Sequence, residues 1–512
     1  MDIPSLFMIP SAVSSGKVHS VFPNSTDADF DFNRDSDATR VNSEGLIERV
    51  GYYGSELVTN GSFDTDSNWI KGTGWSIANG KANSNGTINQ SLVQNGVFTI
   101  SKKYKITFTV SNVNGTLNGR IWMATGGPQF NFSNAGTYTI DWTADQTNLY
   151  ITTLSTNTAS YSIDNISVVE VTGDRARLNY EIEGGLVNTK PSLLLEPQST
   201  NLIKYSNDFT QSEWNKISGA TVDANVIISP DGTLNASRLN FNTVSGSRME
   251  DQIASASSGD YSFAVYLKAD EPKTIGIRTG FAGTPTVNVN VTTEWQRFSI
   301  TQNNPTNPAN GYAQIRSIDA SGGSVYVWGA QIEQLSYSTS FIPTNGSTQT
   351  RAAETCRGAG TSSIFNDSEG VLFAELKNIA NDGTNKCISI SAGLSASERV
   401  TIVLGTGDNI IRPMVKAGGV SVFDATTSSY NTINNFVKIA VRYKANNFAC
   451  WVNGTQVLTD TSGAIPTGLD TLKFDIGNNT LHFYGKVRDI RVYNTKEMTD
   501  SEVDILLTKI TS

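Results

Sequence analysis

The chain has few charged residues and almost no histidine. Charged side chains make up 17% of its 512 residues, and the only two histidines are His19 and His482. Histidine is the usual general base near neutral pH, and the sequence has no Gly-x-Ser-x-Gly, His-Glu-x-x-His or Walker A motif. We therefore predict that the protein binds its target and does not catalyse a reaction, although two suitably spaced carboxylates could still hydrolyse a glycan.

Cysteine, positive charge and long apolar runs are also scarce. The three cysteines (Cys356, Cys387 and Cys450) have no Cys-x-x-Cys spacing, so we expect buried free thiols and not disulfides or a metal site. The net charge of −9 argues against a nucleic-acid partner. No apolar run reaches the roughly 18 residues of a membrane span, and residues 1–10 lack the basic start of a secretory signal. We expect no membrane insertion and folding in a cytoplasm.

Serine, threonine, asparagine and glycine, with 44 glycines, make up much of the composition in place of charged residues. This composition is typical of short strands joined by many turns. A chain of this length predicts about three or four domains. We therefore predict an all-β fold made of several antiparallel β-sandwich modules.

Two parts of the chain repeat one order of features. Each has an opening stretch followed by a tryptophan (Trp69 or Trp214), then strands of alternating hydrophobicity, then a closing strand. The clearest alternating strands cover residues 104–110 and 261–267, and period-two alternation marks a half-buried strand. We predict two antiparallel jelly rolls, residues 56–171 and 196–350, joined by a connecting segment, residues 172–195.

The last third of the chain predicts a further β-sandwich, residues 356–512. Alternation up to Val452 is followed by Asn453-Gly454, the strongest hairpin signal in the chain. A short helix is predicted at the end, because Thr499 and Glu502 have the spacing of a capping box.

The N-terminal segment, residues 1–55, predicts a different kind of structure. Residues 31–48 are crowded with Asp, Asn, Arg and Ser and have almost no helical period. Such a segment rarely builds a core of its own. We therefore expect residues 1–55 to form an extended N-terminal arm that orders on another polypeptide.

Several segments resemble bacteriophage structural proteins of the tail-fibre and head-fibre type. They are residues 31–48, the Leu-Leu-Leu-Glu-Pro-Gln stretch within 191–202, and residues 337–346 followed by 350–353. The resemblance implies a virion protein, assembled in the host cytoplasm and anchored to other virion proteins by its arm. Phage fibres often trimerise, so a homotrimer is the favoured assembly, although no heptad stretch specifies a coiled coil.

The arm carries candidate attachment residues. Arg34, Asp35, Arg40 and Glu44 lie in the stretch that resembles phage proteins. Paired Arg–carboxylate contacts are strong and directional, so these side chains are expected to lock onto a virion partner.

The β-rich domains resemble carbohydrate-recognition modules. The strand order and the Asn-Gly-Ser-Phe opening at residues 60–63 resemble carbohydrate-binding-module jelly rolls. Residues 485–494 followed by 498–502 resemble the laminin-G-like, concanavalin-like lectin superfamily. The resemblance implies a fibre, spike or decoration protein that binds host-surface or environmental glycans. Two alternatives stay open: a purely structural tail or capsid component with jelly rolls as spacers, and a polysaccharide depolymerase.

Two tryptophans are candidates for glycan binding. Sugars have apolar faces and polar rims, so their sites combine an exposed aromatic ring with polar side chains. Trp75, between Gly74 and Ser76, and Trp122, near the loop at 126–128, are the best placed of the eight tryptophans. The alternative for each is a position in the core.

A structural calcium ion is a further expectation, carried over from carbohydrate-binding-module jelly rolls, where it ties the first strand to the last. The oxygen ligands would be Asn60, Asp64 and Asp164. In the second repeat Trp328 stands where Asp164 stands in the first, which argues against calcium there. The alternative is that these Asn and Asp side chains cap turns. No other cofactor is expected.

Overall fold

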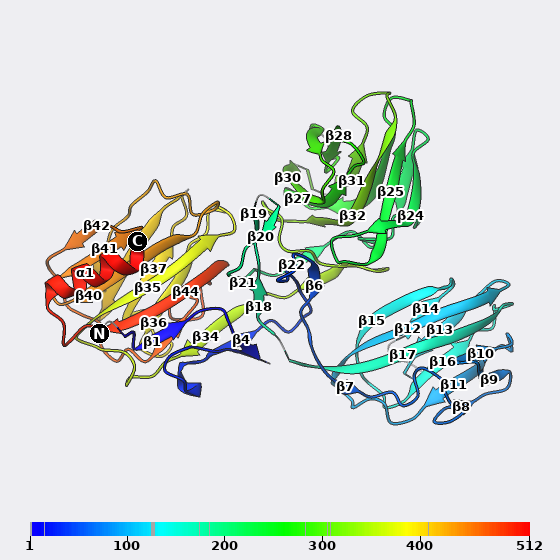
Figure 1. Cartoon of the computed structure of the whole chain (residues 1–512), viewed down its shortest axis with the longest axis horizontal. Coiled ribbons are helices and arrows are strands. Elements are labelled where there is room, and N and C mark those ends of the chain that lie inside the picture. Colours follow the sequence, from blue (N-terminus) through cyan, green and yellow to red (C-terminus); the bar gives the residue numbers. More distant parts are fainter. Residues whose placement is uncertain are drawn as a thin grey trace. The chain divides into compact units, whose positions relative to one another are not determined.

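The computed structural model describes residues 3–14, 16–123, 129–173, 175–183, 185–281, 283–304, 306–307, 309–407 and 409–512, with the backbone alone at 52–54, 141, 172 and 173. The chain forms two compact units, Gly51–Gly173 and Met1–Val50 together with Asp174–Ser512. Both consist of antiparallel sheets (Figure 1), so the predicted all-β class is confirmed. None of the described helices is both long and apolar enough to cross a membrane.

The unit Gly51–Gly173 is the first jelly roll. Its strands are β7 Tyr52–Glu56, β8 Ile70–Lys71, β9 Trp75–Ala78, β10 Lys81–Ser84, β11 Gln90–Gln94, β12 Lys103–Asn114, β13 Gly119–Trp122, β14 Gln129–Phe132, β15 Gly136–Thr143, β16 Leu149–Thr153 and β17 Ser160–Gly173. They form one sheet of order β15-β12-β17-β10-β9, with β7 on β17, and a second of order β14-β13-β16-β11-β8. The alternating residues of β12, among them Ile106 and Phe108, are buried in the core as predicted.

Residues 199–351 form the second jelly roll. Its strands are β22 Ser199–Asn201, β23 Trp214–Ile217, β24 Thr221–Ile228, β25 Leu234–Phe241, β26 Arg248–Ala256, β27 Gly259–Lys268, β28 Lys273–Arg278, β29 Val287–Val291, β30 Gln296–Asn304, β31 Ala309–Arg316, β32 Gly323–Glu333 and β33 Gln349–Arg351. The two main sheets have the orders β23-β26-β31-β28-β29 and β24-β25-β32-β27-β30, and β22 pairs with β33. The first of these orders repeats that of the β8 sheet strand for strand.

The rest of the chain builds the C-terminal sandwich. Its own elements are β34 Thr355–Ala359, β35 Glu369–Asn378, β36 Lys386–Ser391, β37 Arg399–Leu404, β38 Ile411–Ala417, β39 Val420–Asp424, β40 Val437–Lys444, β41 Phe448–Val452, β42 Thr455–Asp460, β43 Thr471–Lys473, β44 Gly485–Asn494 and α1 Asp500–Thr511. The predicted turn joins β41 to β42, with φ of +47° at Asn453 and +82° at Gly454. The predicted capping box between Thr499 and Glu502 is present.

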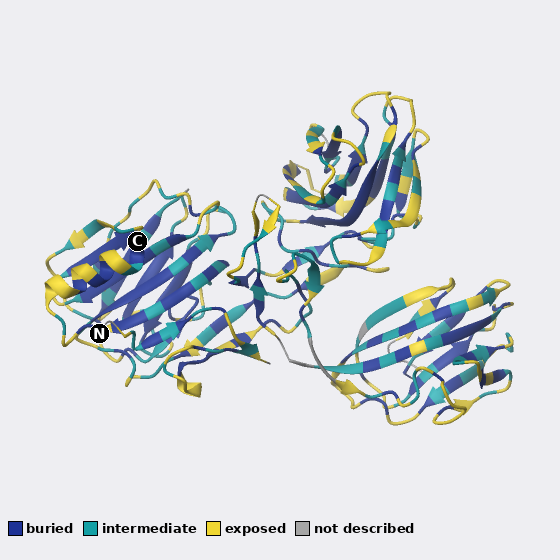
Figure 2. Ribbon diagram, viewed as in Figure 1, coloured by how far each residue is buried: buried dark blue, intermediate teal, exposed yellow. Residues whose placement is uncertain are grey.

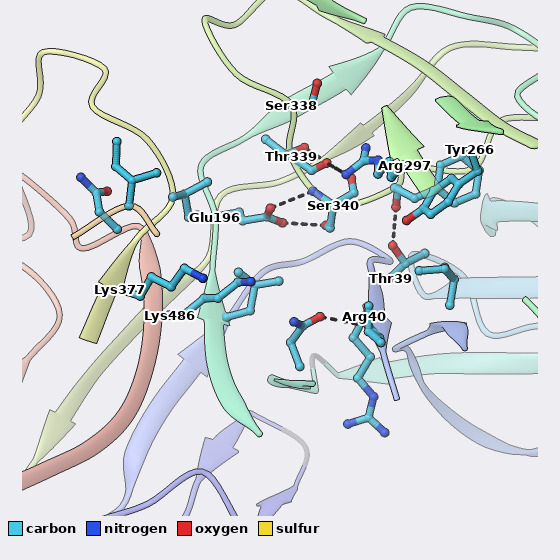
Figure 3. A pocket seen from close by; sticks show the side chains of 18 residues that line it. Thr39, Arg40, Glu196, Tyr266, Arg297, Ser338, Thr339, Ser340, Lys377 and Lys486 are labelled. Carbon is cyan, nitrogen blue, oxygen red and sulfur yellow. Dashed lines mark hydrogen bonds between the residues drawn. The ribbon is translucent and has the colours of Figure 1, made fainter. Parts of the chain in front are cut away.

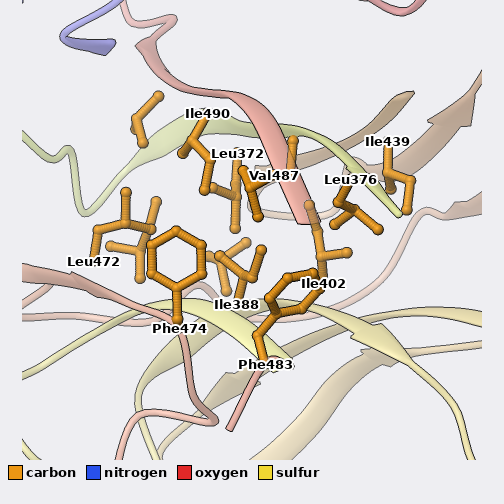
Figure 4. Packing of buried hydrophobic residues seen from close by; sticks show 14 of the residues in the cluster. Leu372, Leu376, Ile388, Ile402, Ile439, Leu472, Phe474, Phe483, Val487 and Ile490 are labelled. Carbon is orange, nitrogen blue, oxygen red and sulfur yellow. The ribbon is translucent and has the colours of Figure 1, made fainter. Parts of the chain in front are cut away.

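Two apolar layers stabilise the sandwich. Side chains from both sheets, including Leu372, Ile388, Phe474 and Ile490, pack together between them (Figure 4). Helix α1 exposes one side to solvent (Figure 2), and its buried residues Val503, Leu506 and Leu507 cover the outside of β35, β40 and β41. The three cysteines are free and buried, as expected.

The described residues of 3–50 fold with other parts of this chain and do not form an extended arm. They contribute β1 Leu6–Met8, β2 Val13–Ser14, β3 Lys17–Val18, the 3-10 turn η1 Thr26–Ala28, β4 Phe30–Asn33 and the hairpin β5 Thr39–Val41 with β6 Ile47–Arg49. Strand β1 pairs with β44, and β4 pairs with β34. Leu6, Met8 and Phe30 are fully buried in the shared core. The prediction of a separate arm is therefore corrected: this segment completes a domain of its own chain.

The connecting segment adds two strands to the sandwich, β18 Arg177–Asn179 and β21 Ser192–Leu195. Its other two strands, β19 Ile182–Glu183 and β20 Leu186–Val187, pair only with each other. The eight-stranded sheet has the order β18-β21-β44-β35-β40-β41-β42 with β1 on β44, and the nine-stranded sheet has the order β2-β3-β4-β34-β43-β36-β37-β38-β39. Leu193 and Leu195 are fully buried. Their apolar side chains would be exposed to water if the segment were a free linker, and packing against the sandwich removes that cost.

Candidate functional site

The outer face of one sheet in the first jelly roll carries an aromatic pair. Trp122 in β13 and Tyr150 in β16 are direct antiparallel partners, and both are half-buried. Their neighbours Ile121 and Ile151 are fully buried in the core, so period-two alternation turns both rings outward. Trp122 thus lies outside the core, and its part in glycan binding stays a prediction. The loop at 126–128 that was expected beside it lies outside the described residues.

Hydrogen bonds fix the pair on the sheet. The two ring centroids are 5.3 Å apart with an interplanar angle of 45°. The indole Nε1–H of Trp122 donates to Thr152 Oγ1 at 2.7 Å, and Thr152 Oγ1 also lies 2.7 Å from Ser91 Oγ. The Trp122 ring therefore has a defined orientation before any ligand arrives.

Polar groups border the aromatic rings. Arg120 extends along Trp122, with its guanidinium carbon 5.8 Å from the ring centroid, and donates from Nε to Asn131 Oδ1 at 3.1 Å. We call Arg120, Trp122, Asn131, Tyr150 and Thr152 the aromatic platform. It combines apolar ring surface with amide, hydroxyl and guanidinium groups, which is the combination that sugar recognition needs.

The platform lies in a row that crosses the whole sheet. Direct strand partners along the row are Gln129, Trp122, Tyr150, Val93 and Ile70. Five strands span about 19 Å at the usual strand spacing. Ile70 at one end is 57% exposed and Gln129 at the other is exposed. The row is therefore long enough for an oligosaccharide, not only for a single sugar ring.

Sequence reasoning missed Arg120, Asn131, Tyr150 and Thr152. A signal for Tyr150 was present, because Leu149, Tyr150 and Ile151 alternate between apolar and amphipathic side chains. The register that places Tyr150 beside Trp122 depends on the pairing of two strands that are not consecutive in the chain, and no local pattern encodes it.

The prediction for Trp75 is wrong. Its side chain is 7% exposed and packs edge-on against Tyr161, with ring centroids 5.6 Å apart and an interplanar angle of 86°. Its Nε1–H donates to the Gln90 carbonyl oxygen at 3.3 Å. Trp75 belongs to the core, on the same face of β9 as the buried Ile77.

The expected calcium ligands make separate local hydrogen bonds. Asn60 donates from Nδ2 to the carbonyl oxygens of Thr65 and Ser67 at 2.6 and 2.9 Å. Asp64 accepts a hydrogen bond from Ser62 Oγ, and Asp164 accepts one from the next backbone N–H. These contacts are of the turn-capping kind. The described residues include no cluster of three His, Cys, Asp or Glu that could hold a metal, and a calcium site stays a prediction.

The candidate attachment residues divide into two groups. Arg34 is 1% exposed and donates to Glu354 Oε1 at 2.9 Å and to the Val50 carbonyl oxygen at 2.7 Å, so its prediction as a contact to another protein is corrected. Arg40 pairs with Glu48 at 2.5 Å. Asp35 and Glu44 are exposed.

Arg34 is part of a buried ion cluster. Arg177 and Arg351 bind Glu196 at 2.8 and 2.9 Å, and Arg34 and Arg177 each bind Glu354 at 2.9 Å. Burial alone would raise the pKa of Glu196, but the charges of Arg351 and Arg177 outweigh it and hold the pKa below its ordinary value. Both carboxylates are at most 4% exposed. They join distant segments of the chain and are not available as a catalytic pair.

A cavity of about 310 Å³ lies beside this cluster (Figure 3). Its charged lining residues are Arg40, Glu196, Arg297, Lys377 and Lys486. Lys377 and Lys486 both bind Glu181, at 3.2 and 2.6 Å. Glu196, which points to Ser340 (Figure 3), is the only acid among the described residues that line the cavity. The cavity therefore lacks the two facing acids of a glycoside hydrolase.

Comparison with known sequences identifies the last domain. Residues 376–504 match the concanavalin A-like lectin/glucanases superfamily. The match confirms the lectin-like resemblance of the C-terminal sandwich and covers about a quarter of the chain. No curated protein matches the chain in sequence.

Three solved structures illustrate weak similarities to this chain. The CBM40 of the Ruminococcus gnavus IT-sialidase, bound to α2,3-sialyllactose, has 10% identity and a TM-score of 0.25, with 30% of this chain and 92% of that chain covered. The CBM22-1–CBM22-2 tandem of Paenibacillus barcinonensis Xyn10C has 9% identity and a TM-score of 0.21, with 56% of this chain and 98% of that chain covered. Trypanosoma rangeli sialidase in complex with sialic acid has 9% identity and a TM-score of 0.23, with 98% of each chain covered. At scores this low, none of them identifies a function.

Proposed function

We propose that the chain is a non-catalytic glycan-binding protein and that the aromatic platform of the first jelly roll holds the sugar. One observation carries the proposal: Trp122 and Tyr150 lie side by side on an outer sheet face, 5.3 Å apart, within a row of polar and apolar side chains. Buried aromatic rings stabilise a fold, whereas rings on an outward face bordered by polar groups suit a ligand.

The chemistry of the platform matches that of a sugar. The apolar C–H face of a pyranose stacks on the Trp122 and Tyr150 rings, while Arg120 and Asn131 are within reach of its hydroxyl groups. Because the bond to Thr152 already orients the Trp122 indole, binding loses little side-chain entropy. Stacking on the two rings involves no charge, and the one cationic group, Arg120, already donates to Asn131, so an uncharged glycan fits the platform.

Binding is favoured over cleavage for a physical reason. Glycoside hydrolysis needs two carboxyl groups, one of them with a raised pKa, on opposite sides of the scissile bond. The buried carboxylates beside the cavity are ion-paired, and the Glu196 pKa is lowered, not raised. The alternative of a depolymerase predicts new reducing ends when the protein is incubated with host capsule.

We infer a more specific role beyond glycan binding, that of a phage virion protein. The chain would be a fibre, spike or decoration subunit that binds host-surface or environmental glycans. The resemblance of residues 31–48 and 191–202 to phage fibre proteins supports it. Strands β4 and β21 of those segments belong to the chain's own sandwich, so attachment would use exposed residues such as Asp35 and Glu44. The alternative, a structural spacer, predicts a subunit in the particle that binds no glycan. Locating the chain in a reconstruction of the whole virion tests the role and its trimeric assembly.

The calcium proposal is tested separately. Calcium bound through Asn60, Asp64 and Asp164 would raise the unfolding temperature of the first jelly roll, because a ligand that binds only the folded state stabilises it. A titration that leaves this temperature unchanged would show that these side chains only cap turns.

A glycan array with the full chain tests the main proposal. The wild-type protein should bind a set of uncharged glycans, and Trp122→Ala should weaken that binding by about 30-fold, as loss of a central aromatic contact does. Trp142→Phe, on the opposite sheet of the same jelly roll, is the matched control and should bind normally. An array without hits, or hits that survive Trp122→Ala, would refute the platform.

A further inference from the structure

The second jelly roll has an outward face of its own on the sheet β23-β26-β31-β28-β29. Alternation along these strands turns one set of side chains away from the core. On β26 and β31 the inward set includes the fully buried Met249 and Ile315. The outward set is mostly polar and includes Arg248, Glu250, Gln252, Arg278, Tyr312, Gln314 and Arg316.

Strand register brings three arginines together on this face. Arg248 and Arg316 are direct partners across β26 and β31. Arg278 lies on the other side of β31, opposite Gln314, which is two residues from Arg316. Gly276 is the direct partner of Arg316, and a Cβ at Gly276 would lie 3.0 Å from Arg316 Cγ. The missing side chain at Gly276 therefore gives the stem of Arg316 room to lie across the sheet.

The arginines have too few anionic partners. Glu250 accepts hydrogen bonds from Arg248 Nε at 2.6 Å and from Gln314 Nε2 at 2.7 Å. Within the described part of the chain, the guanidinium groups of Arg278 and Arg316 make no hydrogen bond or ion pair, and Arg278 Nε is buried without a partner. Three guanidinium groups and one carboxylate leave two uncompensated positive charges on a protein of net charge −9.

This arrangement costs the fold free energy. Burial and the neighbouring charges of Arg248 and Arg278 lower the pKa of Arg316, as like charges at short range do. A buried guanidinium nitrogen without a partner is also unfavourable. An anion between Arg278 and Arg316 would relieve both effects, because the planar guanidinium group matches a carboxylate with two parallel hydrogen bonds.

We propose that this face binds the acidic groups of a charged saccharide, with Arg278 and Arg316 as the anion-binding residues. The neighbouring groups favour a sugar over a free ion: Gln252 Nε2 donates to Tyr312 Oη at 3.2 Å, which places an amide, a hydroxyl and a half-buried ring beside the arginines. The face also has the same place in its jelly roll as the aromatic platform has in the first. The inference concerns a second module and does not depend on binding at Trp122.

Binding of the full chain to matched charged and neutral sugars tests the proposal. Oligogalacturonate and dextran sulfate are the charged probes, and the methyl ester of the first and plain dextran are their neutral counterparts. At least one charged probe should bind about tenfold or more tightly than its counterpart, as expected when a charge-assisted hydrogen bond is lost. Binding of oligogalacturonate alone assigns a carboxylate, and binding of dextran sulfate alone assigns a sulfate. No preference for either charged probe would overturn the proposal.

Variants assign the effect to these residues. Arg278→Gln with Arg316→Gln should weaken binding of the charged probe by about tenfold or more and should not lower the unfolding temperature, since it removes like-charge repulsion. Arg238→Gln removes one positive charge from the other sheet of the same module and should bind normally. Unchanged binding by the double variant, a clearly lower unfolding temperature, or tighter Arg278- and Arg316-dependent binding of single-stranded DNA would each contradict a saccharide site.

Discussion

The two jelly rolls are alike in a row of buried apolar side chains that crosses one sheet on its inner face. They differ in the chemistry of the adjacent row on the outer face. In the first, Leu92, Ile151 and Ile121 are partners across three strands, and in the second the equivalent row is Met249, Ile315 and Ile277; all six side chains are fully buried. One residue further along each strand, the outward-facing row of the first jelly roll is Val93, Tyr150 and Trp122. The corresponding row of the second is Glu250, Gln314 and Arg278.

The difference teaches which positions the fold constrains. Inner side chains must be apolar and of suitable volume, because the core is close-packed. Outer side chains do not pack into this core, although Glu250 and Gln314 are also buried, and they can change chemistry at less cost to the fold. One strand order therefore presents an apolar, aromatic surface in one module and a cationic surface in the other.

Two tryptophans of the first jelly roll separate the inner and outer roles, and this is the largest expected effect. Trp75→Ala should lower the free energy of unfolding of the module by about 3–5 kcal/mol, because it opens a cavity beside Tyr161. Trp122→Ala should lower it by about 1 kcal/mol or less, because the ring lies on the surface. Urea unfolding measures both values. Equal losses would show that Trp122 serves the core and not a ligand.

Exchanging the outer rows tests whether the surfaces alone set specificity. Arg278→Trp with Gln314→Tyr gives the second jelly roll the aromatic pair of the first. We expect it to lose about 2 kcal/mol of binding free energy for a charged saccharide and to gain affinity for uncharged ones. Trp122→Arg with Tyr150→Gln is the reciprocal exchange. Isothermal titration with both sugar types measures the change, and unchanged preferences in both variants would contradict the comparison.

Two equivalent positions beside the inner rows, Gln94 and Asp251, predict that the stabilities of the two jelly rolls depend differently on pH. Gln94 in the first jelly roll makes two hydrogen bonds with the Thr59 backbone, while Asp251 has the equivalent position in the second. Burial and the charge of Glu213 raise the pKa of Asp251 to about 7. The folded state then keeps a proton that the unfolded state releases near its lower pKa, so this stability is full at low pH and is lost as pH rises through about 7.

Asp251→Asn should abolish that pH dependence. At about pH 8 the variant should be more stable than the wild type by about 1–2 kcal/mol, after allowance for partial solvent screening, and near pH 4 the two should be equal. Urea unfolding at a series of pH values measures this. Asp223→Asn, an exposed position in β24, is the control. A variant with the wild-type pH profile would show that Asp251 does not titrate as inferred.

Salt should have the smallest effect, and it should differ between the two faces. Binding at the aromatic platform should change by less than about twofold between low and high ionic strength, because stacking involves no net charge. Binding at Arg278 and Arg316 should weaken several-fold, since exposed charge interactions are screened beyond about one Debye length. Titrations of each sugar at several sodium chloride concentrations make the comparison, and equal salt dependence would contradict the assignment of the two faces.

Local signals in the sequence predicted local structure well. The Asn453-Gly454 turn and the Thr499–Glu502 capping box each depend on residues that are close together in the chain, and both are present. Alternation in β12 likewise identified a strand whose inward residues are buried. The two repeats could be found because each strand carries its own period.

Long-range pairing explains what the sequence did not predict. Strand β4 pairs with β34, which lies beyond both jelly rolls in the chain, and the Arg34 guanidinium meets Glu354 just before that strand. Nothing near Arg34 indicates that partner, so its polar surroundings were interpreted as an exposed arm. Trp75 and Trp122 show the same limit, because alternation gives the face of a strand but the partner strands decide which face is inward.

The most direct measurement follows the indole N–H signals of the full chain by NMR while an uncharged glycan from the array is added. The eight tryptophans give eight such signals, and Trp122→Phe identifies one of them. Our account predicts that the Trp122 signal shifts on binding while the signal of the buried Trp75 stays in place. A Trp122 signal that does not move while the glycan binds would contradict it.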